Sequence, residues 1–327
     1  MTKIVVITGA GAGVGRATAR FFALQGCDVG LIGRDPGRLE RAAAELRDMG
    51  VRTAVALADV ADPGAVDAAA SAIEQSLGPI DIWVNNAMAT VFAPVADTTT
   101  GEFRRGTEVT YFGTVHGTLA ALSRMRPRGR GIIINVGSAL AYRSIPLQAV
   151  YCGAKSAIRG FTDSLRSELI HDRAGIHLCM VHLPALNTPQ FDWALNKLGR
   201  RARPVPPVYQ PEVAARAIVF AAFHPRREIW VGMPTIVAIL ANRIAPGLTD
   251  WYLARTGYAG QMTTEPLEAG ELDNLYEPVK GDYGAHGRFG DGARRTSWEM
   301  FTSRHRDAMT IGILLAGIWT IRRWLRR

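Results

Sequence analysis

The sequence predicts an α/β protein in which a doubly wound, mostly parallel sheet of seven strands is covered on both faces by helices. Three observations support this fold class. Short apolar runs alternate with longer segments of helical period from the first residue to about residue 231, the apolar run comes first in each pair, and prolines or small polar residues open several helical segments. Strands covered on both faces are continuous apolar runs, because each side meets helices.

The elements follow in order along the chain. The expected strands lie at 3–8, 28–32, 52–57, 80–84, 131–136, 176–182 and 228–231, and helices between them include 36–49, 63–77 and 149–172. After Gly232, residues 236–255 predict one or two apolar helices, broken at Pro246 and Gly247. Residues 257–307 are rich in glycine, proline and acids and have little periodicity, which is typical of a loop-rich extension or linker.

Composition indicates one large domain with an appendage. The chain has 327 residues, 48% hydrophobic and 20% charged, which excludes wholesale disorder and collagen-like repeats. We expect one large α/β domain over 1–255, a loop-rich segment over 256–307 and a tail helix over 308–327. Three cysteines without a CxxC pair, and scattered histidines, predict neither disulfides nor a metal site. His116, His177 and His182 lie in apolar patterns and are interpreted as structural.

The tail carries most of the excess charge. The chain has 38 Lys and Arg against 29 Asp and Glu, a net charge of +9, and residues 294–327 hold eight arginines against Glu299 and Asp307, or +6. Residues 308–321 have no charge. As a helix they would span about 21 Å, short of the roughly 30 Å hydrocarbon core of a bilayer. Membrane attachment, either shallow or as a span that recruits Trp324 and Leu325, is the favoured interpretation. A helix buried against the core or a second subunit, and a disordered tail, stay open.

The basic tail alone does not predict nucleic-acid binding, because no recognition fold or aromatic platform accompanies it. The first apolar run, Ile4 to Ile7, is too short for the apolar region of a signal peptide. We therefore expect a cytoplasmic protein, attached to the cytoplasmic face of a membrane under the favoured interpretation of the tail.

A glycine-rich loop follows the first expected strand and precedes a helix. The general G-x-G-x-x-G spacing fails, because Val14 or Arg16 stands where its last glycine should be, whereas G-x-x-x-G-x-G fits Gly9, Gly13 and Gly15. Glycines here permit a tight turn and let a pyrophosphate approach backbone N–H groups at a helix N-terminus. The alternative is an ordinary strand-to-helix turn.

Further motifs follow the later strands: Asp59-Val60, Asn85-Asn86-Ala87, Ser138, and Tyr151-x-x-x-Lys155. With the glycine loop, they resemble the short-chain dehydrogenase/reductase family over about residues 1–232. The resemblance implies a Rossmann fold, an NAD(P)-dependent oxidoreductase, and a coenzyme site at the carboxyl ends of the strands. Matching positions imply coenzyme contacts from Gly9, Gly11, Gly13, Val14, Gly15, Asp59, Val60, Asn85, Ala87, Tyr151, Lys155, Leu186 and Thr188.

The end of the second strand indicates which coenzyme is used. An acid at position 33 would bind the ribose hydroxyls of NAD, but Gly33 leaves room and Arg34 offers a guanidinium suited to a 2′-phosphate. The sequence thus favours NADP(H) over NAD(H). The alternative is that Arg34 is a solvated surface residue.

Tyr151 and Lys155 lie four residues apart, which places them on one face of a helix. The ordinary pKa of a phenol is about 10, and a nearby ammonium would lower it. The family resemblance implies that Tyr151 donates a proton to the substrate carbonyl, that Lys155 also binds the nicotinamide ribose, and that Ser138 hydrogen-bonds the same oxygen. Hydride comes from the coenzyme.

Three positions depart from the family pattern. Thr110 stands where the family has an Asn that holds a water in a proton relay to the lysine, and we interpret its hydroxyl as a substitute. Met88 and Pro184 stand where glycine is usual. These departures leave open an alternative from another class, a catalytically weak nucleotide-bound sensor or membrane-tethered interaction protein on the same fold.

Residues near the expected substrate carbonyl are apolar. Ala139, Leu140, Ala185 and Leu186 contribute, and the segment 188–198, which closes over the substrate in the resembling family, carries Phe191, Trp193, Leu195 and Leu198. We therefore predict a lipophilic ketone, aldehyde or alcohol as substrate, although these spacings also fit an ordinary amphipathic helix. A homodimer or homotetramer is expected from the resemblance.

Overall fold

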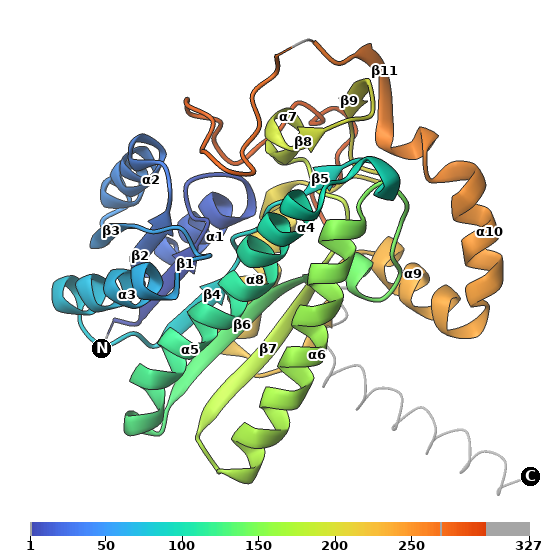
Figure 1. Ribbon diagram of the computed structural model, residues 1–327. Helices are drawn as coiled ribbons and strands as arrows, with labels where there is room; N and C mark the ends of the chain where they lie inside the picture. The colour runs from blue at the N-terminus through green and yellow to red at the C-terminus, as the bar shows by residue number, and fades with distance from the viewer. Residues whose placement is uncertain (1, 269, 299–327) are drawn as a thin grey trace, which may run out of the picture.

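A computed structural model describes residues 2–268 and 270–298 and shows a parallel sheet between two layers of helices (Figure 1). The order in the sheet is β10-β7-β6-β4-β1-β2-β3, and every neighbouring pair is parallel. All seven predicted strands are present: β1 (Ile4–Thr8), β2 (Asp28–Gly33), β3 (Thr53–Leu57), β4 (Ile82–Asn85), β6 (Gly131–Ser138), β7 (Ile176–Leu183) and β10 (Glu228–Trp230). The strand order reverses between β1 and β4, and such a switch point opens a crevice at the carboxyl ends of the strands.

Helices connect the strands and extend the chain beyond them. They are α1 (Gly13–Ala23), α2 (Pro36–Asp48), α3 (Pro63–Leu77), α4 (Thr100–Thr107), α5 (Gly113–Met125), α6 (Ala149–His171), α7 (Gln190–Trp193), α8 (Pro211–Phe223), α9 (Met233–Ile244) and α10 (Pro246–Thr256). Short 3-10 turns lie at Val95–Asp97, Arg126–Arg128, Ala139–Ala141 and Ala259–Gln261, and a π-helical turn joins α4 to α5 at Glu108–Phe112.

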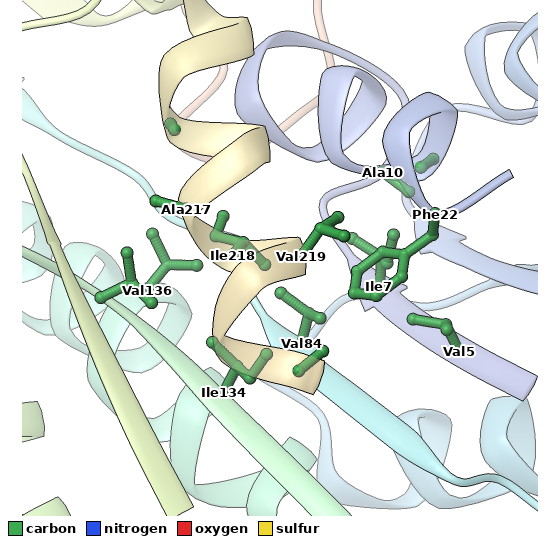
Figure 2. Packing of buried hydrophobic residues seen from close by; sticks show 14 of the residues in the cluster. Val5, Ile7, Ala10, Phe22, Val84, Ile134, Val136, Ala217, Ile218 and Val219 are labelled. Atoms are coloured by element: carbon green, nitrogen blue, oxygen red, sulfur yellow. The ribbon is translucent and has the colours of Figure 1, made fainter. Parts of the chain in front are cut away.

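Each face of the sheet has its own hydrophobic core, because side chains alternate along a strand. Val5 and Ile7 of β1 pack with α1, α2 and α8, as Figure 2 shows for part of this cluster. Ile4 and Val6 of the same strand pack on the opposite face with α3, α5 and α6. Both residue sets are buried, which explains why β1 is apolar without alternation.

The helices that follow β2 and β3 begin at well-defined caps. The Asp35 carboxylate accepts from the Arg38 N–H, and the Asp62 carboxylate accepts from the N–H groups of Gly64 and Ala65; a proline follows each cap. A capped N-terminus with proline at the first helical position is a strong start signal. The caps fix where the chain turns away from the carboxyl end of each strand, beside the crevice.

The C-terminal part of the described chain returns to the sheet. The predicted break is confirmed, since α9 ends at Ile244 and α10 begins at Pro246. The sequence did not predict two small strand pairs, β5 (Val91–Phe92) with β8 (Leu195–Asn196) and β9 (Arg200–Ala202) with β11 (Met262–Pro266). Beyond β11 the chain crosses back towards α7, α1 and α2 (Figure 1).

Within residues 2–268 and 270–298, no helix is long and apolar enough to cross a bilayer. The predicted tail helix at 308–327 lies outside the described residues.

Candidate functional site

The glycine loop joins β1 to α1 at the carboxyl edge of the sheet. Gly9 and Gly13 have φ of +67° and +56°, a backbone conformation that favours glycine. A Cβ on Gly15 would lie 2.2 Å from the Gly9 carbonyl oxygen, closer than any real contact. The chain therefore needs glycine at these three positions so that the first turn of α1 can lie directly against the loop, and a helix N-terminus at this place suits a pyrophosphate.

A pocket opens at this edge of the sheet, beside the loop. Nine of the predicted coenzyme contacts line it: Gly9, Gly11, Gly13, Val14, Arg34, Asp59, Val60, Ala87 and Thr188. These residues come from four strand ends and from the segment after β7, so the fold brings together positions up to 179 residues apart, from Gly9 to Thr188. The pocket thus fits a dinucleotide by its position at the switch point and by its glycine cradle.

Five predicted coenzyme contacts, Gly15, Asn85, Tyr151, Lys155 and Leu186, do not line this pocket. Gly15 acts through the close packing described above. The buried Asn85 amide donates to Thr118 Oγ1 and to Asn135 Oδ1, both at 2.9 Å, so it ties β4 to its neighbours. Leu186 is buried in the core. Asn85 and Leu186 therefore support the wall of the site from behind.

The pocket is also lined by fourteen residues that the sequence analysis did not name as coenzyme contacts: Ala12, Gly33, Asp35, Arg38, Leu39, Ala58, Asn86, Met88, Val109, Pro189, Gln190, Trp193, Asn274 and Pro278. Asn86 lies within the quoted motif, and its amide donates to the Thr8 carbonyl at 3.0 Å, which holds the glycine loop to the end of β4. Trp193 was expected at the substrate, but α7 is one short turn that places this ring beside the coenzyme pocket. Asn274 and Pro278 gave no local signal, because only the long return of the chain brings them here.

Arg34, at the adenosine end of the pocket, is engaged by the C-terminal part of the chain. Its guanidinium donates to the Tyr276 carbonyl at 2.5 Å and to the Asn274 carbonyl, and lies 3.9 Å from the Asp59 carboxylate. Burial opposes ionisation of Asp59, but the Ala61 N–H and the Arg105 guanidinium lower its pKa below the ordinary value. Asp59 is therefore ionised and helps to hold both arginines.

Ser138, Tyr151 and Lys155 come together at the end of β6 and on the first turns of α6. The Ser138 side chain lies close enough to Tyr151 to act on the pKa of the phenol, and its hydroxyl accepts from the Leu140 N–H at 3.1 Å. The Lys155 ammonium lies 5.6 Å from the centre of the Tyr151 ring and donates to the Val136 carbonyl at 2.6 Å. Two hydroxyls and an ammonium in contact form a device that can orient an oxygen and exchange a proton with it.

Burial sets the protonation of this group, and one expectation was wrong. Burial raises the pKa of Tyr151 above its ordinary value, against the effect of the Ser138 side chain, and lowers the pKa of Lys155 to about 7. The sequence predicted that Lys155 would lower the pKa of the phenol. Desolvation dominates instead, because it disfavours the charged form of both groups.

Thr110 does not take the place of the relay Asn. It is fully buried in the π-helical turn at Glu108–Phe112, a kind of bulge that recurs at functional sites. Its hydroxyl accepts from the Ala89 N–H and donates to the Ala89 carbonyl, both at 3.0 Å. A hydroxyl carries one proton, and that proton is committed to Ala89. Thr110 therefore holds the segment after β4 and has no proton left to pass on.

His182 lies beside the candidate site, next to the main chain of Ser138. It is fully buried on β7, and its ring nitrogens lie 3.2 Å from the Ser138 carbonyl oxygen and 3.2 Å from the Glu228 carboxylate. The neighbouring His182 and, to a smaller extent, Tyr142 lower the pKa of Glu228 to about 2. The buried His182 ring contacts the main chain at Ser138 through the Ser138 carbonyl.

Comparisons with known proteins agree with this geometry. The family described as short chain dehydrogenase matches residues 3–196. The chain is 30% identical to the uncharacterized oxidoreductase YxnA of Bacillus subtilis over 318 residues, 97% of this chain and 88% of the relative. It is 38% identical to dehydrogenase/reductase SDR family member 7B of Bos taurus over 260 residues, 75% and 78% of the two chains.

Two solved structures share the fold. An alcohol dehydrogenase from the archaeon Thermococcus sibiricus, complexed with 5-hydroxy-NADP, has a TM-score of 0.60 and 25% identity, and the match covers 71% of this chain and 96% of that one. L-Sorbose reductase from Gluconobacter frateurii, complexed with NADPH and L-sorbose, has a TM-score of 0.62 and 26% identity, over 70% and 95%. With a family match over more than half of its length, this chain belongs to the short-chain dehydrogenase/reductase family of NAD(P)-dependent oxidoreductases.

Proposed function

We propose that the protein uses NADP(H) to interconvert a lipophilic ketone or aldehyde and its alcohol, with Ser138, Tyr151 and Lys155 as the catalytic residues. The contact between the Ser138 and Tyr151 hydroxyls beside the Lys155 ammonium is the observation that carries this proposal. When bound, NADP(H) supplies or accepts the hydride. The glycine loop would hold its pyrophosphate, and Thr188 and Lys155 would lie towards its nicotinamide end.

Each of the three side chains has one task in the reductive direction. Tyr151, whose pKa burial raises, keeps its proton at neutral pH and gives it to the substrate oxygen. Ser138 donates a hydrogen bond to that oxygen as negative charge develops on it. Lys155, with a pKa of about 7, holds its positive charge in part of the molecules at neutral pH, and that charge stabilises the phenolate left on Tyr151.

The preference for NADP(H) rests on the basic residues at the adenosine end. Gly33 and Arg34 line the pocket, and Arg38 lies beside them with its guanidinium 4.8 Å from the centre of the Trp193 ring. Both solved neighbours named above carry an NADP-type coenzyme. A guanidinium binds a phosphate through parallel charge-assisted hydrogen bonds, so these arginines suit the 2′-phosphate that distinguishes NADP from NAD.

An apolar surround supports a lipophilic substrate. Ala139 and Leu140 follow Ser138 directly, and Ala141 is buried. Phe191 packs against Phe92 and Phe289, with each pair of ring centres 5.8 Å apart. Phe191 lies in the segment 188–198 that is expected over the substrate, and a lipophilic carbonyl compound would find apolar contacts beside these rings.

A panel of carbonyl compounds tests this proposal. Purified full-length protein is mixed with NADPH or NADH and a series running from small hydroxy acids to long-chain and cyclic ketones, and coenzyme oxidation is followed by absorbance. We expect turnover to rise with substrate apolarity, and kcat/KM for NADPH to exceed that for NADH about tenfold, the size expected for a charge-assisted hydrogen bond. Turnover confined to charged hydroxy acids, or a preference for NADH, contradicts the proposal.

One observation favours the alternative of a nucleotide-bound sensor. The Thr110 hydroxyl is committed to Ala89 and leaves no side-chain proton for a relay at that position. A sensor would bind coenzyme with little or no turnover across the whole panel. The catalytic Ser, Tyr and Lys are nevertheless all present and in contact, which is why we favour the enzyme.

For the tail we propose attachment to an anionic membrane surface through residues 308–327, supported by their apolar stretch and flanking arginines. The exposed apolar side chains of α9 and α10, including Ile244 at 81%, Leu248 at 72% and Trp251 at 59% exposure, offer a further lipid-facing surface. We expect the full chain to sediment with phosphatidylglycerol vesicles and a chain ending at Asp307 to do so far less. Equal sedimentation of both chains would contradict the anchor.

A further inference from the structure

We propose that residues 273–284, which we call the C-terminal strap, determine the preference for NADP(H) by holding Arg34 and Arg38 in place for the 2′-phosphate. The strap runs beside the coenzyme pocket, and two of its residues, Asn274 and Pro278, line that pocket. The inference rests on the NADP(H) preference proposed above. It assigns a role to a segment that follows the matched residues 3–196.

The strap is fastened at both ends. At its start the Asn274 N–H donates to the Trp193 carbonyl at 2.9 Å, and the side chain of Leu275 is fully buried. At its end the Asp282 carboxylate pairs with Arg16 and, at 3.2 Å, with Arg41, while the Gly284 carbonyl accepts from the Gly13 N–H at 3.0 Å. The strap therefore spans from α7 to the glycine loop across the adenosine end of the pocket, where the orange chain passes α7 and α2 in Figure 1.

Between these fastenings, strap carbonyls bind the guanidinium groups of the pocket. Arg34 donates to the carbonyls of Asn274 and Tyr276, and Arg38 donates to the carbonyl of Val279. A third arginine, Arg105, donates to the Leu275 carbonyl at 3.0 Å. Four strap carbonyls, three of them from consecutive residues, thus orient three arginines, which lie just after β2, in α2 and in α4.

Two aromatic rings also hold the Arg38 guanidinium in place. Its guanidinium lies 4.8 Å from the centre of the Trp193 ring and 5.6 Å from that of Tyr283, a strap residue. The two rings contact each other edge to face at 4.6 Å. Arg38 is buried, with 8% of its surface exposed. Stacked and hydrogen-bonded in this way, the side chain keeps few of its rotamers.

Fixing these side chains in advance favours phosphate binding. An unrestrained arginine loses rotamer entropy when it is held in one geometry, and pre-organisation removes that penalty from the binding step. Carbonyl oxygens orient a guanidinium without neutralising its charge, so the remaining N–H groups stay available to an anion. The benefit falls on a ligand that carries the 2′-phosphate and is small for one that lacks it.

Two fragments of the coenzyme separate this role from a general structural one. 2′,5′-ADP and 5′-AMP differ only in the 2′-phosphate, and calorimetric titration measures the binding of each without any turnover. The test variants are Asp282→Asn, which weakens the pairing with Arg16 and Arg41, and Leu275→Ala, which removes the buried side chain at the other end. Thermal unfolding checks that each variant is folded.

Asp163→Asn is the matched control, because the Asp163 carboxylate also joins two arginines, Arg166 at 2.6 Å and Arg227 at 2.7 Å, but lies on α6. We expect Asp282→Asn and Leu275→Ala to weaken 2′,5′-ADP binding on the order of tenfold and 5′-AMP binding less than about twofold, as loss of pre-organisation predicts. Asp163→Asn should change neither.

The outcomes distinguish failure of the strap from failure of the coenzyme assignment. If the unaltered protein does not prefer 2′,5′-ADP over 5′-AMP, the NADP(H) preference is wrong. If it does, and Arg34→Leu removes that preference while both strap variants keep it, the strap inference alone is wrong. Equal weakening of 2′,5′-ADP and 5′-AMP binding in the strap variants also overturns the strap inference, because the strap would then support the pocket in general. Tighter binding of 2′,5′-ADP by these variants overturns it as well, because the strap would then obstruct the phosphate site.

Discussion

Replacing Tyr151 with phenylalanine is expected to lower kcat by about 10²- to 10⁴-fold, the usual contribution of a positioned general acid. The variant loses the only proton that the side chain at this position can give to the substrate oxygen. Affinity for NADPH should stay within about twofold, because Tyr151 does not line the coenzyme pocket. Steady-state kinetics and NADPH fluorescence titration measure the two effects separately.

Tyr252→Phe serves as the control for this change. Tyr252 lies on α10 with 60% of its surface exposed, and its substitution should leave kcat unchanged. Retention of most of the activity in the Tyr151→Phe protein would contradict the proposed chemistry. A biological function that survives this variant in full would support the sensor instead.

Replacing Lys155 with methionine is expected to abolish most turnover and to change how stability depends on pH. Burial lowers the pKa of Lys155 to about 7 in the folded protein, whereas an unfolded chain titrates near 10.4. Between these values the unfolded chain binds one proton more, so this group makes stability rise by about 1.4 kcal/mol per pH unit from about pH 7 towards pH 10. Below pH 7 both states are protonated and the slope from this group vanishes.

The methionine variant lacks this titration. Its melting temperature should exceed that of the unaltered protein most at or below about pH 7, and the excess should shrink as the pH rises towards 10. Thermal unfolding at several pH values between these limits measures the trend, and Lys3→Met, at an exposed lysine, is the control. A difference that does not vary with pH would mean that burial does not depress this pKa.

The fold and the family could be read from local patterns. Each strand of the main sheet is a buried apolar run, as Ile4–Thr8 illustrates, and the helices start at caps such as Asp35 and Asp62. The spacing of Gly9, Gly13 and Gly15 followed from backbone geometry, since only glycine permits the turn and the close approach of α1. Period, caps and glycine spacing depend on neighbours a few residues away, so a sequence reports them directly.

The site could be predicted only in part. Ser138, Tyr151 and Lys155 come together as expected, but the pKa values of Tyr151 and Lys155 depend on how deeply the fold buries them. Thr110 was interpreted as a relay residue, and only its contact with Ala89 shows that its proton is committed. Burial and hydrogen-bond partners are set by segments distant in sequence.

The sequence by itself determined the architecture and the family, and it predicted the place of the coenzyme and the reacting side chains, because each is encoded in short-range spacing. Only the tertiary structure decided what surrounds them. Arg34 is recognisable as a guanidinium at the end of a strand, but its partners Asn274 and Tyr276 lie 240 and 242 residues away, in a segment without periodicity. Any residue can supply a backbone carbonyl, so contacts of this kind leave no pattern in the sequence. The role of the strap could therefore be recognised only in the tertiary structure.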